Sequence, residues 1–102
     1  MQLEVISWSD KTTPTARDLH ARLEADGFDV WSWSDGPSFD YKPHVHDHDE
    51  SVWVVEGEIT FGVDGQPYRL GAGDRLMLPA GTVHTAHAGR SGAAYLIGER
   101  RE

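Results

Sequence analysis

The sequence predicts an all-β fold, either a sandwich or a barrel, with one helix near the N-terminus. After residue 28, apolar and polar residues alternate in several short stretches, which is the period of a half-buried strand. Eleven glycines and four tryptophans suit short strands joined by tight turns around a small core. The length of 102 residues matches one domain, so we expect a single domain over 1–102. Within it we expect a strand and helix over about 1–27 and a barrel over about 28–99.

The one predicted helix covers about residues 14–26. Thr13 is expected to cap its N-terminus, and Pro14 suits the first helical position. Gly27 stands where the helix is expected to end. Apolar residues follow one another at helical spacing inside this segment: Ala16, Leu19 and Leu23.

The strands are expected to be short and separated by turns. Asp64-Gly65 predicts a tight hairpin turn, and Asp35-Gly36-Pro37 predicts another turn. Pro43 predicts an edge strand or a bulge. The predicted strands cover residues 3–8, 28–34, 39–46, 51–55, 59–63, 67–70, 75–78, 83–87 and 93–97.

Composition excludes several classes of protein. The chain has no cysteine, which excludes disulfide frameworks, zinc fingers, iron–sulfur clusters and cysteine nucleophiles. The net charge of −8 argues against a nucleic-acid binder or a protein of anionic membranes. No apolar run approaches the roughly 20 residues that span a bilayer, and the first residues lack a secretory signal. We therefore expect a cytoplasmic protein that binds no nucleic acid and no membrane.

The histidines are spaced like metal ligands. His44 and His46 are two residues apart on a predicted strand, so both imidazoles project from the same face. Glu50 follows four residues later, and His84 lies on a later strand. Three imidazoles and one carboxylate suit Mn, Fe, Co, Ni or Zn. The spacing alone leaves an alternative open, in which the acidic, histidine-rich stretch 44–50 is a solvated loop.

A longer pattern surrounds these residues. His44-x-His46 is followed after three residues by Glu50, and after six more by Gly57. This spacing resembles the first signature motif of the cupin superfamily. One position departs from that motif, because Ser38 stands where it usually opens with glycine.

A second pattern follows further along the chain. Gly73, five residues, Pro79-x-Gly81, two residues and His84 together resemble the second cupin motif. The two motifs are 15 residues apart, which resembles the short separation in small microbial cupins. The motif usually ends in asparagine, and Ala88 stands at that position; the asparagine is not a metal ligand in the family pattern.

The resemblance implies the cupin double-stranded β-helix, a jelly-roll barrel. It also implies that His44, His46, Glu50 and His84 bind one divalent transition metal, either Mn, Fe, Ni, Co or Zn. Glu50 is in addition the candidate catalytic residue, since it could shift from ligand to general base.

Strand parity predicts the surroundings of the ion. Ala86 and Ala88 share the inward parity of His84, so small side chains are expected to leave room beside the metal. Val52 and Val54 are expected to wall the pocket. The closed end of the barrel is expected to be filled by Ile59, Phe61 and Val63.

The remaining polar and aromatic candidates receive more modest roles. We expect His48 to be exposed to solvent, although its parity matches that of His46. His87 is expected to face away from the ion, and His20 to lie on the helix surface. Trp31 and Trp33 share a strand face, for which core packing is favoured over lining the barrel. Three further polar side chains are candidates for the pocket mouth: Tyr41, Lys42 and Tyr95.

The resemblance implies a function only by class. The leading hypothesis is a metal-dependent enzyme acting on a small organic molecule, of the oxygenase, isomerase or lyase type. The alternative is a non-catalytic cupin that binds or senses a small ligand through its metal, and a mainly structural metal is the third hypothesis. We also expect a homodimer, because small cupins are often dimers and the apolar side chains of Leu3, Val5 and Trp8 could pair with a partner's sheet.

Overall fold

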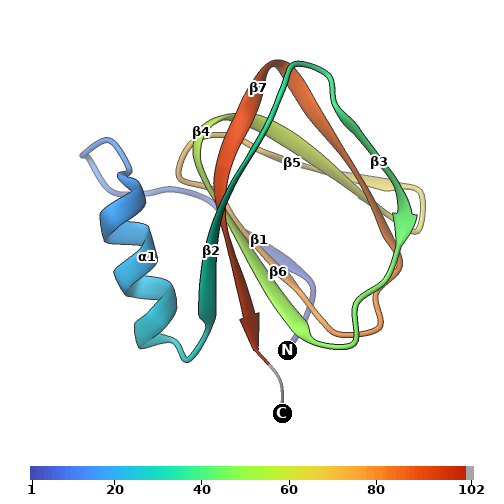
Figure 1. Ribbon diagram of the computed structural model, residues 1–102, viewed down its shortest axis with the longest axis horizontal. Coiled ribbons are helices and arrows are strands. Elements are labelled where there is room, and N and C mark those ends of the chain that lie inside the picture. Colours follow the sequence, from blue (N-terminus) through green and yellow to red (C-terminus); the bar gives the residue numbers. More distant parts are fainter. Residues whose placement is uncertain (101–102) are drawn as a thin grey trace.

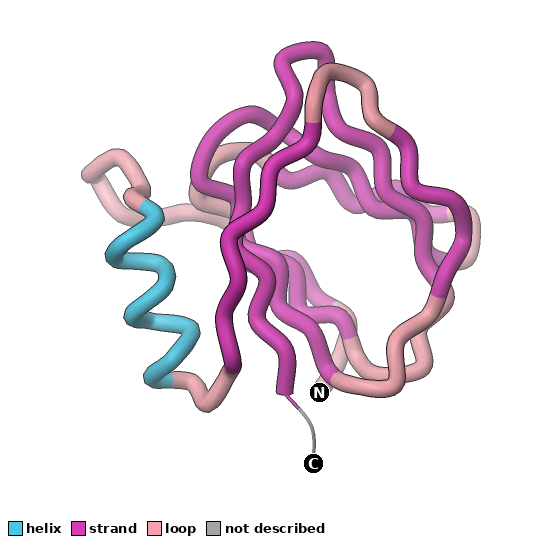
Figure 2. The backbone as a smooth tube through the Cα atoms, viewed as in Figure 1, coloured by secondary structure: helices cyan, strands magenta, loops and turns pink. Residues whose placement is uncertain are grey.

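One antiparallel sheet of seven strands makes up most of the described chain, as the computed structural model shows for residues 1–100 (Figure 1). The sheet curls into a barrel, and the single helix lies against its outside (Figure 2). The predicted all-β class with one N-terminal helix is confirmed. The elements are β1 (Glu4–Ile6), α1 (Ala16–Ala25), β2 (Asp29–Asp35), β3 (Asp40–His44), β4 (Asp49–Val63), β5 (Gln66–Leu70), β6 (Arg75–Leu78) and β7 (His84–Arg100).

Two long strands organise the barrel. The sheet order is β1-β6-β4-β7-β2, with β5 added to β4 and β3 added to β7. The first part of β4 pairs with β6 and its last part pairs with β5, while β7 pairs first with β3 and then with β2. Each long strand therefore bends and joins two parts of the barrel.

The sequence prediction of separate strands over 51–55 and 59–63 is wrong, because one bent strand, β4, covers both ranges. The pairing of β4 with β7 shifts register between Val54 and Glu56 and again between Gly57 and Ile59. Such a bulge bends a strand without ending it. The same reason applies to β7, which was predicted as two strands. The predicted bulge near Pro43 is confirmed by a register shift between Tyr41 and His44.

The helix starts two residues later than the sequence predicts. Thr15, not Thr13, is the N-cap, because Thr15 has extended backbone angles and its side chain accepts a hydrogen bond from the Asp18 backbone N–H. The predicted end is confirmed. Gly27 has a φ of 89°, and the Phe28 N–H donates to the Leu23 carbonyl, as in a Schellman motif. In residues 1–100, no helix is long and apolar enough to cross a membrane.

Alternation along β4 and β7 supplies two apolar clusters. Val52 and Tyr95 point into the barrel, whereas their neighbours Trp53 and Leu96 point outward beneath the helix. The outer cluster is completed by Leu19 and Leu23 of α1 and by Phe28. Leu19 and Leu23 are fully buried, and each such burial stabilises the fold by about 1.5–3 kcal/mol. The helix is thereby fixed to the outside, and the barrel interior is left for the site.

Candidate metal centre

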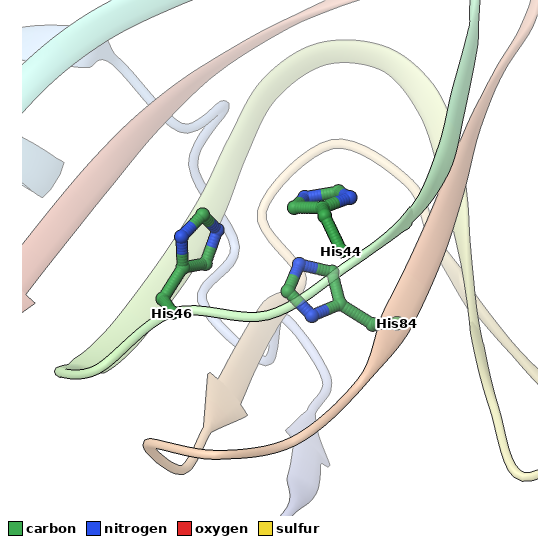
Figure 3. A group of neighbouring side chains, drawn as sticks. All are labelled: His44, His46 and His84. Atoms are coloured by element: carbon green, nitrogen blue, oxygen red, sulfur yellow. The ribbon is translucent and has the colours of Figure 1, made fainter.

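Three imidazoles from separate segments meet inside the barrel. His44 on β3 and His84 on β7 are cross-strand partners, and their ring centroids are 4.2 Å apart. His46 follows β3, and its ring centroid lies 5.1 Å from that of His44 and 5.2 Å from that of His84 (Figure 3). One nitrogen of each ring lies within 4.8 Å of the other two. Pairing of two strands thus joins the histidines of the two sequence motifs.

Backbone carbonyls orient two of these rings. His44 Nδ1 lies 2.7 Å from the Lys42 carbonyl oxygen, and His84 Nδ1 lies 2.9 Å from the Thr82 carbonyl oxygen. A carbonyl oxygen only accepts, so each Nδ1 carries the hydrogen and each Nε2 has a free lone pair. Metal-binding histidines characteristically donate their second ring nitrogen in this way. The donor set therefore fits a divalent transition metal.

The loops that carry the two motifs are also joined. The Gly81 N–H donates to the His46 carbonyl at 2.9 Å, and the Ala80 N–H donates to Asp49 Oδ1 at 2.9 Å. Pro79-Ala80-Gly81 is thereby held against the His46–Glu50 segment. These bonds fix how far His46 and His84 can move apart.

Glu50 lies beside the three imidazoles rather than among them. Its Oε2 is 3.5 Å from His46 Nε2, and its side chain is buried. With His46 and His48 it forms a second group of donor atoms within 4.8 Å of one another. The structure thus brings all four predicted ligands to one place, with His46 common to both groups.

The expectation that His48 is exposed is wrong, because its side chain is only 8% exposed. Its ring stacks on that of His46, with centroids 5.2 Å apart and an angle of 26° between the planes. Its Nε2 has no hydrogen-bond partner among residues 1–100, although Glu99 Oε1 lies 3.1 Å away. The chain bends at residues 47–48, yet only Asp47 is exposed, so His48 keeps the burial that its parity with His46 implies.

Burial sets the protonation of this cluster. It lowers the pKa of His46 and of His84, and the neighbouring imidazoles lower both further. Both rings therefore stay neutral at pH values somewhat below the ordinary histidine pKa of about 6.5. The neutral ring is the form that binds a metal. Burial raises the pKa of Glu50, which means that its carboxylate lacks full compensation from the protein alone. A bound cation would supply that compensation.

The histidines line a cavity of about 240 Å³. Val52, Ala86 and Phe61 line it as well, as the inward parity of their strands predicts. Val54 and Ala88 are buried, but they are not among the lining residues. The cavity has room for about eight water molecules at about 30 Å³ each, which suits a small organic ligand. The lining also contains Trp33, Tyr41 and Tyr95.

The exposure of the two tryptophans of β2 contradicts a second expectation. Core packing was favoured for both, but Trp31 is 52% exposed and Trp33 is 53% exposed. Trp33 lines the cavity instead, as the alternative held. Their strand lies at one end of the sheet order, where one side chain face is only partly covered.

The other histidines lie where the sequence predicts. His87 is exposed and contacts Asp40 across the β3–β7 pair. His20 lies on the surface of α1, 3.2 Å from Glu24. Neither belongs to the two donor groups.

Two acidic residues at the site were missed. Asp35 was assigned to a turn, yet its carboxylate accepts hydrogen bonds from Tyr41 and Tyr95. Glu99 lies directly across from Glu50 in the β4–β7 pair and lines the cavity. No motif contains either residue, and only the strand register could have revealed them.

Comparison with known proteins agrees with this geometry. The family model described as cupin domain matches residues 33–97. Quercetin 2,3-dioxygenase from Bacillus subtilis (strain 168) is 38% identical over 71 residues, which are 68% of this chain and 21% of that protein. The chain thus spans about a fifth of the length of this curated relative.

Solved structures show the same fold. The DMSP lyase DddQ from Ruegeria pomeroyi DSS-3 is similar over 72% of this chain and 38% of its own, with a TM-score of 0.66 and 26% identity. A cupin superfamily protein from Desulfitobacterium hafniense DCB-2 is similar over 99% of this chain and 79% of its own, with a TM-score of 0.66 and 17% identity. Because the family model covers more than half of its residues, this chain belongs to the cupin family.

Proposed function

We propose that this protein is a divalent-metal-dependent enzyme that acts on a small organic molecule. The ion is held by His44, His46, Glu50 and His84. One observation carries the proposal: imidazoles from both motifs converge beside a buried carboxylate in the wall of a small cavity. A site that served only stability would more often be closed on all sides by protein ligands.

Different residues of the chain orient the metal ligands and accept a proton. Lys42 and Thr82 hold the His44 and His84 rings through their carbonyls, so both Nε2 atoms are ready to bind without reorganisation. Glu50 would balance part of the charge of a bound ion, and its buried carboxylate is the group of the chain that would accept a proton from the substrate. When bound, the metal supplies Lewis acidity and exchangeable positions for ligands.

The apolar wall contributes by excluding water. Val52, Phe61 and Ile97 are among the side chains that line the cavity. Polar interactions with a bound molecule are stronger in such surroundings than in water.

The names of the relatives support the reaction type only broadly. One is called a dioxygenase and another a lyase, and both are much longer than this chain. We propose that this chain shares one of these reaction types, with the oxygenase type placed first because the dioxygenase is the relative with the higher identity.

The test is turnover by protein loaded separately with Fe²⁺, Mn²⁺, Co²⁺, Ni²⁺ or Zn²⁺. Flavonols, diketones, sugars and aromatic acids are supplied with and without dioxygen, and products are identified by mass spectrometry. We expect conversion of at least one class that depends on the metal, and dioxygen consumption if the enzyme is an oxygenase. Tight binding of these compounds without conversion would contradict the enzyme hypothesis and favour a non-catalytic ligand-binding cupin.

A further inference from the structure

Three aromatic side chains that line the same cavity as the histidines gather around Asp35. The Tyr95 hydroxyl donates to Asp35 Oδ2 at 2.6 Å, and the Tyr41 hydroxyl donates to Asp35 Oδ1 at 2.5 Å. Trp33 Nε1 lies 2.9 Å from the Tyr41 oxygen and 3.2 Å from Asp35 Oδ1, so its hydrogen is shared. The two tyrosines and Trp33 line the cavity, whereas Asp35 lies behind them.

This arrangement fixes where the phenol hydrogens point. Both are directed at the Asp35 carboxylate, which cannot itself donate. Burial and the bond to Asp35 raise the pKa of Tyr95 far above that of an ordinary tyrosine, and the same two causes raise the pKa of Tyr41. Both phenols therefore remain protonated. The Tyr41 oxygen already accepts from Trp33 Nε1, so the lone pair left for a ligand is that of the Tyr95 oxygen. What this group presents to a ligand is a hydrogen-bond acceptor at Tyr95.

The two phenols are close to the proposed metal ligands. The ring centroids of Tyr41 and His44 are 6.2 Å apart, and both side chains line the same cavity. A ligand of one or two rings therefore reaches from the histidines to the phenols. The walls between them are apolar or aromatic, which favours a flat ligand.

The negative charge of Asp35 decides which end of a ligand lies beside the tyrosines. The carboxylate of Asp35 repels an anionic group. It also already accepts a hydrogen bond from each of the two phenols. A substrate carboxylate or deprotonated oxygen is thus directed toward a bound metal, whose charge would offset Glu50 and Glu99 in the cavity lining. A neutral hydroxyl is the group that finds an acceptor at Tyr95.

We propose that Tyr95, oriented by Asp35 beside Tyr41, forms a hydroxyl-binding subsite. The substrate class is then small, planar, hydroxylated molecules that chelate the metal with one pair of oxygens and donate a second hydroxyl to the Tyr95 oxygen. This inference rests on the proposed metal-dependent function and narrows its substrate.

The experiment compares three probes with one chelating group. Salicylate carries only the chelating pair, while 2,4- and 2,5-dihydroxybenzoate add a hydroxyl at different places on the ring. Titration of the cobalt-loaded protein, followed by its visible spectrum, gives a Kd for each. We expect at least one dihydroxy probe to bind about tenfold more tightly than salicylate, the ratio typical of one net hydrogen bond.

The variants assign that preference to the subsite. Tyr95→Phe, alone or together with Tyr41→Phe, should remove the tenfold preference while salicylate keeps its wild-type Kd. Tyr68→Phe is the matched control, because Tyr68 lies on β5 outside this cavity, and it should keep the preference. Unchanged salicylate binding also shows that each variant is folded.

Each contrary outcome has its own meaning. If salicylate binds but neither added hydroxyl improves binding, or if the preference survives in the double variant, the subsite is overturned and the metal site stands. If no probe changes the spectrum of the cobalt-loaded protein, the open metal site itself is overturned.

Discussion

The rings of His44, His46 and His84 are held by different means. Backbone carbonyls fix the first and the last, whereas His46 stacks on the buried ring of His48. A rotation of His46 is therefore limited by packing rather than by a hydrogen bond. His48 thus serves the site by supporting its neighbour, and its buried Nε2 faces Glu50 and Glu99.

Tyr95 gives a prediction for alkaline pH. The unfolded chain releases a tyrosine proton near a pH of about 10, whereas the folded chain keeps the Tyr95 proton because its pKa is raised. The contribution of this hydroxyl to the free energy of unfolding is fully present below about pH 10 and lost as the pH rises further. Urea unfolding between about pH 9 and about pH 11 should show a decline that is smaller in Tyr95→Phe. An equal decline in both proteins would contradict the bond to Asp35.

The positions of site residues could be predicted where the local spacing of residues determines them. They could not be predicted where long-range strand pairing determines them. Period two places His44 and His46 on one face, and the motif adds Glu50 and His84. The position of His48 depends on whether the chain turns before β4, which parity cannot tell. Asp35 reaches the tyrosines only because β2, β3 and β7 pair in one particular register.

The bends of β4 and β7 meet at one point beside β2. Gly57 has a φ of 78° and Gly92 a φ of 77°. A Cβ on Gly57 would lie 2.2 Å from the Gly92 oxygen, and a Cβ on Gly92 would lie 2.4 Å from the Asp35 oxygen. The backbones of three strands thus approach at the position that presents Asp35 to the phenols. Both glycines lie within long strands and not between short ones.

Gly57→Ala should destabilise the barrel strongly. The substitution puts a side chain in the left-handed region and against backbone that cannot move aside, which costs about 3 kcal/mol. Gly36→Ala is the control, since its Cβ would meet nothing within 4 Å, and it should change stability by less than about 0.5 kcal/mol. Urea unfolding measures both. Similar stabilities for the two variants would show that the bulge tolerates a side chain.

At the scale of the whole molecule, the helix and β1 close the outside of the barrel. Leu3 and Val5 pack against the barrel core, and Trp8 packs against the helix cluster. These side chains, which had suggested pairing with a partner, thus have contacts within the chain. The ends of the sheet order are β1 and β2, and β2 carries the half-exposed Trp31.

The homodimer stays a prediction, and β2 is the place where we expect it to form. An edge strand with exposed tryptophan is covered favourably by a second copy. Light scattering at micromolar concentration should give twice the chain mass, and Trp31→Ser should shift the protein toward monomer. A monomer mass for the unaltered protein would contradict the prediction.

The most direct test of the account is the metal content of the protein and of two histidine variants. After loading with Mn²⁺, Fe²⁺, Co²⁺, Ni²⁺ or Zn²⁺, elemental analysis should find about one ion per chain in the unaltered protein and in His87→Ala. His84→Ala should bind the ion about 100-fold more weakly or worse, since loss of a ligand costs at least as much as loss of its supporting contacts, while circular dichroism shows an intact barrel. An unaltered protein that takes up none of these ions, or a His84→Ala variant that holds them equally well, would contradict the metal centre.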